Sequence, residues 1–194
     1  MLKLGRFITL ILAGTISALM FTSLAACSSG PNPNAKKVLV GCYAVTSGQI
    51  GKIFGVSHPD AMMLSGENSP IQVCKYTDTD TGDTLALLQI KKFDSANAAS
   101  ELAADAAQQK ALFKKNIKPI KIHDADGFGP GAFYVDNTIS PSVSSVQLYL
   151  INNGYKMMIQ VLNPKDFPTG EQQAAAIATQ AFASIKDKSA YKTL

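Results

Sequence analysis

The stretch "SSVQLYLINNGYKMMIQVLN", residues 144–163, decides the fold class of this protein. Val146, Leu148 and Leu150 alternate with more polar side chains, as in a strand that buries one face. The Asn-Gly pair at 153–154 interrupts this pattern, and it is the pair that most readily takes the positive φ angles of a two-residue turn. The alternation resumes after the turn, so the stretch predicts a β-hairpin.

Further strands are expected on the N-terminal side of this hairpin. Runs rich in β-branched and apolar residues predict strands within 71–77, 84–92, 117–124 and 131–136. Because Pro119 has no N–H to donate to a ladder, the strand within 117–124 is expected at a sheet edge. Residues 58–70 are expected to form a loop. Short links between successive strands favour a mostly antiparallel sheet.

Three helices are expected around these strands. Thr46 and Gln49 form a capping box that opens a helix ending at Gly55. An Ala-rich helix is expected over 96–115, and a capping pair, Thr169 and Gln172, opens a last helix to about residue 187. The stripes expected to face the sheet are Ala99, Leu102, Ala106 and Phe113 in the second helix, and Ala174, Ile177, Ala178, Ala181 and Ile185 in the third. The order α-β-β-α-β-β-β-β-α indicates an α+β sandwich.

The first 26 residues are typical of an export signal. Lys3 and Arg6 precede an uncharged apolar run that is short for a membrane span. The run ends in Leu24-Ala25-Ala26-Cys27, which resembles the lipobox of bacterial lipoproteins, in which the cysteine receives diacylglycerol and, with it, palmitate-type acyl chains. The alternative is an ordinary secretory signal in which Cys27 is incidental. We expect a signal peptide over 1–26, a lipidated Cys27 with a flexible tether over 27–41, and one domain over 42–194.

This organisation predicts where the protein resides. A lipid on Cys27 would hold it at the cell membrane or the outer membrane, with the domain facing the periplasm or the cell exterior. The Ser, Gly, Pro and Asn residues of 28–37 carry no periodic apolar pattern, and they would let the domain stand clear of the lipid head groups.

The charged residues exclude some classes of partner. Of 18 lysines and arginines, Lys3 and Arg6 lie in the signal, so 16 remain against 14 Asp and Glu. All 16 are lysines, and the chain has no Trp. Without arginine the domain has no bidentate donor for phosphate or carboxylate. This near-neutral balance argues against nucleic acid as a partner.

Two cysteines remain once Cys27 is assigned to the lipid. Cys42 and Cys74 lie in an exported domain, where paired cysteines are usual, so we expect a disulfide. The alternative is a catalytic thiol or a metal ligand, but the sequence has no CxxC and its only histidines are His58 and His123.

Three short stretches contain residue types that bind metals or phosphates. Asp78, Asp80 and Asp83 are weak candidates for a calcium loop, but the leucines at 85 and 87 and the glutamine at 89 do not continue the pattern, so a hairpin turn is favoured. His123 with Asp124 and Asp126 could ligate a metal or form a base with its orienting partner, although a solvated strand end is favoured. Residues 127–133, "GFGPGAF", are expected to be a turn before a strand rather than a phosphate loop.

The spacing of several residues resembles a group of bacterial exported lipoproteins and sensor-type domains of unknown function. The residues that carry the resemblance are Cys42, Thr46, Ile50, Phe54, Gly55, Cys74 and Tyr76, followed by Gly127, Gly129, Ala132 and Phe133. Pro130 departs from the group, which usually has an acidic residue there. The resemblance spans most of residues 42–194. It implies a PsbP-like α+β sandwich, a Cys42–Cys74 disulfide and a non-catalytic role.

We therefore expect a lipid-anchored binding or interaction module that uses no cofactor. Its expected partners are the membrane, through Cys27, and either an envelope protein or a small hydrophobic ligand. Met62 and Met63 would favour such contacts if they proved to be exposed. The alternatives are an envelope hydrolase that uses His123 with neighbouring Asp residues, and a structural component of an envelope complex.

Overall fold

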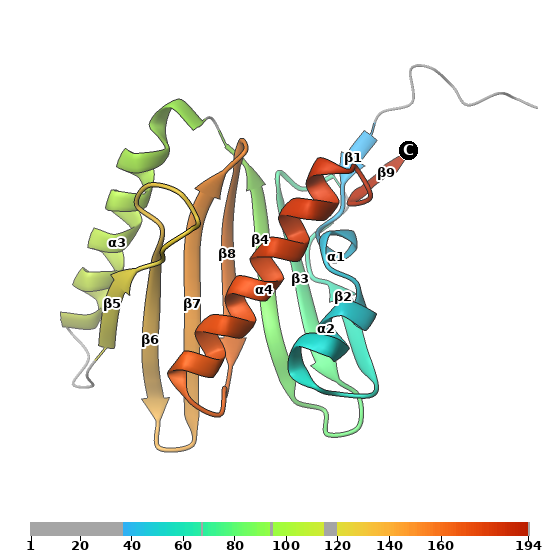
Figure 1. Cartoon of the computed structure of the whole chain (residues 1–194), viewed down its shortest axis with the longest axis horizontal. Coiled ribbons are helices and arrows are strands. Elements are labelled where there is room, and N and C mark those ends of the chain that lie inside the picture. Colours follow the sequence, from blue (N-terminus) through green and yellow to red (C-terminus); the bar gives the residue numbers. More distant parts are fainter. Residues whose placement is uncertain (1–36, 67, 94, 115–119, 194) are drawn as a thin grey trace, which may run out of the picture. The chain divides into compact units, whose positions relative to one another are not determined.

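Seven antiparallel strands form the main sheet of the protein (Figure 1). The computed structural model describes residues 37–66, 68–93, 95–114 and 120–193. In spatial order the strands are β2 (Pro59–Met63), β3 (Ile71–Asp78), β4 (Thr84–Lys92), β8 (Tyr155–Leu162), β7 (Val143–Asn152), β6 (Phe133–Ser140) and β5 (Ile120–Asp124). The β5 strand lies at an edge, as predicted, although Pro119 itself is outside the described residues.

The β7–β8 hairpin confirms the reading of residues 144–163. Asn152 pairs with Tyr155 across the two-residue turn. Both turn residues have positive φ angles, 51° at Asn153 and 78° at Gly154. Left-handed backbone at both positions gives the turn the twist of the strands it joins.

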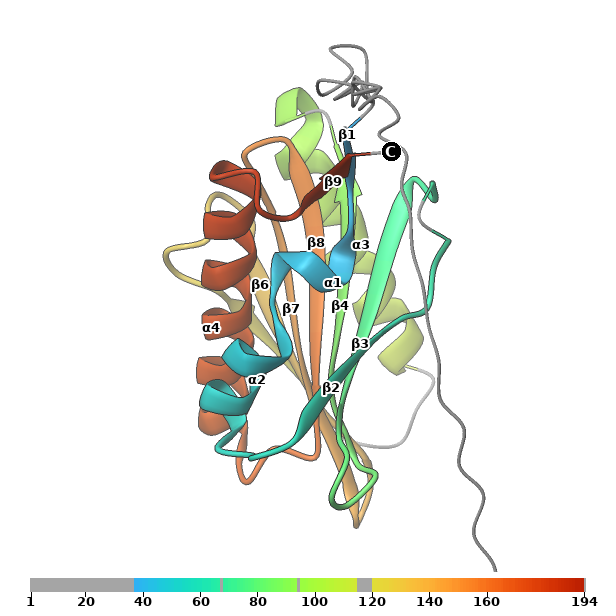
Figure 2. The ribbon, with the colours of Figure 1, turned by 90° about the vertical axis from the view of Figure 1, so that its right-hand side faces the viewer.

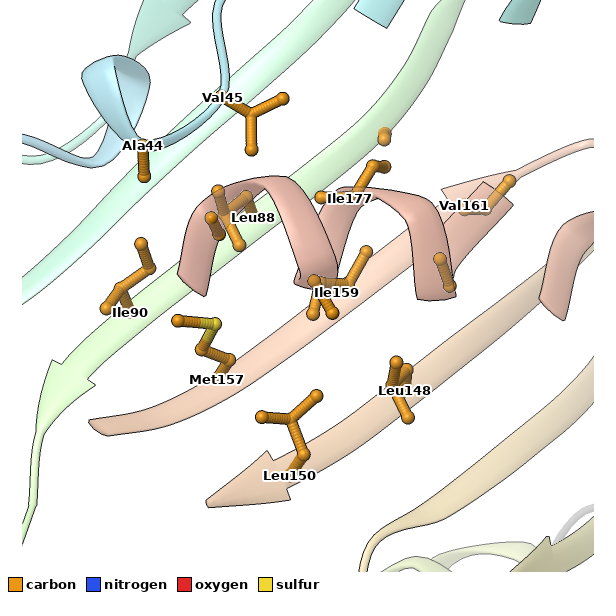
Figure 3. Packing of buried hydrophobic residues seen from close by; sticks show 14 of the residues in the cluster. Ala44, Val45, Leu88, Ile90, Leu148, Leu150, Met157, Ile159, Val161 and Ile177 are labelled. Atoms are coloured by element: carbon orange, nitrogen blue, oxygen red, sulfur yellow. The ribbon is translucent and has the colours of Figure 1, made fainter. Parts of the chain in front are cut away.

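Three helices cover one face of the sheet (Figure 2). They are α1 (Gly41–Ala44), α2 (Ser47–Phe54) and α4 (Phe167–Lys186). The five residues predicted to face the sheet from α4 are all buried: Ala174, Ile177, Ala178, Ala181 and Ile185. They join the main core with fully buried strand residues such as Leu88, Leu148 and Ile159 (Figure 3).

The start of α4 differs from its prediction. Asp166, and not Thr169, is the N-cap, and its Oδ1 accepts the backbone N–H of Thr169 at 2.7 Å. The helix thus starts three residues earlier, because Asp is as good a cap as Thr and Pro168 suits the first turn. The Thr46–Gln49 capping box of α2 and the left-handed Gly55 at its end are as predicted.

Helix α3 (Ala98–Lys114) follows a short 3₁₀ turn, Ser95–Asn97, and packs on the opposite face of the sheet. Leu102 is fully buried there, beside Phe133, Val135 and Ile151. The predicted stripe is only partly right. Ala106 is half-buried, but Ala99, in the first turn of α3, is exposed. The Phe113 side chain lies outside the described residues.

A disulfide joins Cys42 on α1 to Cys74 on β3, as predicted, with 5.0 Å between their Cα atoms. The link closes a separation of 32 residues. In the chain-entropy model a loop of this size stabilises the fold by about 3–4 kcal/mol. A buried hydrogen bond supports the same region, since the Tyr76 hydroxyl donates to the Val45 carbonyl at 2.9 Å.

Two predictions about the chain between elements are wrong. Residues 59–63, expected to be loop, form the edge strand β2, whose Ala61 pairs with Tyr76. Its sequence "PDAMM" has weak strand propensity, which an edge position tolerates. Within the expected tether, β1 (Lys37–Leu39) pairs with the C-terminal β9 (Tyr191–Thr193). Ordered structure therefore begins before residue 42.

The architecture is α+β, with a mostly antiparallel sheet packed with helices, as the order of elements predicted. None of the helices that the structure describes is both long and apolar enough to cross a membrane. The predicted signal peptide, Cys27 and the tether up to residue 36 lie outside the described residues.

Candidate functional site

A hollow of about 280 Å³ lies between α3 and the sheet, and we call it the α3 hollow. Strands β3, β4, β7 and β8 supply most of its lining and α3 supplies the rest. The lining residues are Ile71, Gln89, Lys91, Tyr149, Lys156 and Met158 from the sheet, and Asp105 and Gln108 from α3. Successive side chains of a strand point to opposite faces of the sheet. The neighbours of the lining residues, such as Leu88 and Ile90 on β4, therefore point into the main core on the other face.

Lys156 joins the sheet to α3 through two ion pairs. Its Nζ lies 2.8 Å from Glu101 Oε1 and 2.6 Å from Asp105 Oδ2. The two carboxylates share a helix face because they are four residues apart. Burial by itself would lower the pKa of Lys156, but hydrogen bonds to Asp105 and Glu101 outweigh it and raise that pKa. The hydrogen bond from Lys156 lowers the pKa of Glu101.

Tyr149 forms part of the same lining. Its ring stacks on Phe133, with 4.8 Å between ring centroids and 5° between planes. Its hydroxyl donates to Gln147 Oε1 at 2.9 Å. Burial, helped by the charge of Asp105, raises the pKa of Tyr149 to about 12, so the hydroxyl stays protonated at neutral pH.

A second cluster of charged side chains lies on the α4 face. His123 Nε2 on β5 is 3.2 Å from Glu171 Oε1 on α4 and 3.4 Å from Asp136 Oδ2 on β6. Tyr134 flanks the imidazole, with ring centroids 5.4 Å apart. Burial, and then the charges of Glu171 and Asp136, raise the pKa of the Tyr134 hydroxyl.

The sequence predicted other partners for His123. Asp124 and Asp126 are both exposed, while His123 faces Asp136 and Glu171. Asp124 follows His123 directly on β5, so its side chain points to the other face of the sheet. The structure thus brings His123 together with carboxylates far along the chain. The hydrolase based on His123 with Asp124 or Asp126 gains no support from this arrangement.

The expected calcium candidates form a turn between β3 and β4. Asp78 Oδ1 accepts the backbone N–H of Asp80 at 3.0 Å, and Gly82 has a φ of 78°. The Asp80 carboxylate lies 3.0 Å from His58 Nδ1. Among the described residues, Asp78, Asp80 and Asp83 do not form a group that could hold a metal ion.

The glycine-rich stretch 127–133 leads into β6 and not into a helix. Gly127, Gly129 and Gly131 all have positive φ angles, which suits a series of turns. A phosphate cradle needs a helix N-terminus after the loop, so this geometry agrees with the predicted turn.

Two of the exposed large apolar side chains lie near the β2 edge of the sheet, and Tyr43 on α1 is exposed as well. Met62 is 48% exposed on β2, and Leu64 just beyond it is 53% exposed. Met157 is fully buried in the main core, whereas Met158 lines the α3 hollow.

Sequence reasoning missed most residues of both clusters. Glu101 and Asp105 gave a weak signal, because carboxylates four residues apart on a helix share a face. Asp136 was a second weak signal in the sequence, because it is a charged residue at a position of the strand that faces the core. Lys156 and Glu171 gave no signal, because their partners are distant in the chain.

A scan against protein-family models finds no match for this chain, and no curated protein matches it.

The ion pairs of Lys156 predict a pH dependence. The pKa of Glu101 is lower in the folded protein than its ordinary value of 4.5. This pairing therefore stabilises the fold above that value and is lost as pH falls through the folded pKa. We expect Lys156→Gln to lower the melting temperature by a few degrees at pH 7, and by much less near pH 3.

Lys92→Gln is the matched control, because Lys92 is exposed at the end of β4. The Lys92→Gln variant should have the same melting temperature as the wild type at both pH values. If Lys156→Gln lowered the melting temperature by the same amount at pH 7 and at pH 3, the proposed contribution of the ion pairs to stability would be wrong.

Proposed function

We propose that this protein is a lipid-anchored extracytoplasmic binding module that takes a small amphipathic ligand in the α3 hollow. The observation that carries the proposal is the lining of that hollow, where lysine and glutamine side chains lie beside Tyr149 and Met158. A few placed polar groups with apolar walls are what small-molecule sites usually contain.

The lining favours an anionic or strongly polar group on the ligand. Lys91 forms no ion pair within the part of the chain that the structure describes, although its charge helps to lower the pKa of the Glu101 carboxyl. Its side chain lines the hollow, where the ammonium can also meet an anionic group. Gln89 and Gln108 add amide donors and acceptors. Ile71 and Met158 provide apolar contact for the rest of the ligand.

The Lys156 ion pairs would keep this hollow formed before the ligand arrives. They join α3 to β8 through Nζ to carboxylate distances of 2.6 and 2.8 Å. A site that is already shaped loses less entropy on binding than one that must be ordered. This role needs placed donors and a stable wall, and it needs no bond-breaking chemistry.

The envelope location rests on the N-terminal sequence. Leu24-Ala25-Ala26-Cys27 supports lipidation and membrane attachment, and the Cys42–Cys74 disulfide suits an oxidising compartment. The exposed Met62 and Leu64 would suit a contact with an envelope protein. The PsbP-like arrangement and the role of structural component stay predictions.

Mass spectrometry of the mature N-terminus tests the anchor. We expect a first residue Cys27 that carries a diacylglycerol thioether, together with loss of membrane association in a Cys27→Ser variant. An unmodified Cys27, or a mature chain that starts elsewhere, would refute lipid anchoring while leaving the ligand proposal standing.

A fluorescence titration with 1-anilinonaphthalene-8-sulfonate tests the hollow, because this probe combines an anionic sulfonate with aromatic rings. We expect saturable binding to the folded protein that weakens about two- to fivefold in Lys91→Gln, the size of one exposed ion pair. Met158→Asp should weaken it further by placing a carboxylate among the apolar contacts.

Lys92→Gln is again the control, since it makes the same change one residue along β4 and outside the lining. It should bind the probe as the wild type does. The proposal fails if the folded protein does not bind the probe, or if all three variants bind it equally well.

A further inference from the structure

His123, Asp136 and Glu171 converge from three elements near the β5 edge of the sheet. β5 and β6 are paired strands, and α4 packs across the same face. One ligand atom from each side chain lies within 4.8 Å of the others. Among the described residues, no other group of His, Cys, Asp and Glu comes together in this way.

Two polar atoms of this cluster lack a hydrogen bond. Within the described residues, Asp136 Oδ1 is buried and has no hydrogen-bond partner. His123 Nε2 is also buried, and its close contacts with Glu171 Oε1 and Asp136 Oδ2 do not have the geometry of hydrogen bonds. The Asp136 side chain is only 4% exposed. A buried carboxylate oxygen that is left unpaired is costly, so the carboxylate is poised for a ligand that the chain itself does not supply.

The charges in the cluster do not balance. Two carboxylates face one imidazole, and a proton on that imidazole would offset only one of them. Lys121 is the register partner of Asp136, but its side chain is exposed and no ion pair joins the two in the described part of the chain. A divalent cation beside a neutral imidazole would offset both carboxylates.

The two distances that involve His123 Nε2 match those of a tetrahedral ion. Ligand atoms about 2.1 Å from a tetrahedral Zn²⁺ lie about 3.3–3.4 Å from one another. The distances from His123 Nε2 are 3.4 Å to Asp136 Oδ2 and 3.2 Å to Glu171 Oε1. The three ligand atoms all lie within 4.8 Å of one another, and the unpaired Asp136 Oδ1 belongs to the same carboxylate. We infer that His123, Asp136 and Glu171 bind a divalent transition-metal ion of the Zn²⁺ class.

The three ligands determine which class of ion can bind and how it is coordinated. An imidazole nitrogen suits Zn²⁺ and its neighbours in the first transition row, whereas Ca²⁺ and Mg²⁺ prefer oxygen ligands. The Asp136 side chain is buried, whereas His123 and Glu171 are 27% and 26% exposed, so the ion would lie at the rim of the buried core. The ion would tie the edge of the sheet to α4. This site lies on the face opposite the α3 hollow and does not depend on it.

Isothermal titration calorimetry of the full chain in detergent, with ZnCl₂ as the titrant, tests this inference. We expect one Zn²⁺ per chain and a rise in melting temperature, whereas MgCl₂ at the same concentration has neither effect. His123→Ala should weaken Zn²⁺ binding by more than about a hundredfold, since even outer-shell changes cost 10–100-fold. His58→Ala is the control, because His58 lies in the exposed pair with Asp80, and it should bind as the wild type does.

A second variant guards against simple misfolding. Asp136→Asn should melt at or above the wild-type temperature in EDTA, because it removes a buried charge that lacks compensation. With ZnCl₂ added, it should melt below the wild type. The inference is overturned if Zn²⁺ does not bind, if both histidine variants bind it equally, or if Asp136→Asn is the less stable protein even in EDTA.

Discussion

Helix α4 packs Ile177, Ala178 and Ala181 against the sheet, and this contact forms the centre of the main core. Alanines let the helix backbone come close to the strands, while Ile177 joins Leu88 and Ile159 in the same buried cluster (Figure 3). Burying one isoleucine side chain contributes about 1.5–3 kcal/mol. At Gly170 even a methyl group would meet Val146 Cγ2 at 2.7 Å, so α4 approaches the sheet closely from its first turns.

The opposite face of the sheet is covered much less tightly. Of the α3 side chains that the structure describes, Leu102 is the fully buried one in the smaller cluster, and the ion pairs of Lys156 complete the attachment. Elements with few buried apolar contacts open at lower free energy than the core. A helix held in this way leaves room for the α3 hollow, so the weaker packing and the proposed binding site arise from the same cause.

Sequence patterns predicted the elements whose signals are local. The alternation around Asn153 and Gly154 and the Ala-rich stripe of α4 each lie within one stretch of chain. Strand β2 and the β1–β9 pair escaped prediction, because their strand character comes from partners and not from their own propensity. The His123 cluster escaped for the same reason, since Asp136 and Glu171 reach it only after the sheet and α4 have assembled.

Native-state hydrogen exchange of backbone amides tests the central claim that the α4 side of the sheet is the more stable one and that α3 opens at lower free energy. Amides of α4, and of the β8 strand beneath it, should exchange only through global unfolding, so their exchange free energies should match that of unfolding by denaturant. Amides of α3 should exchange through a smaller, local opening. Exchange from α3 that is as slow as exchange from α4 would contradict this account.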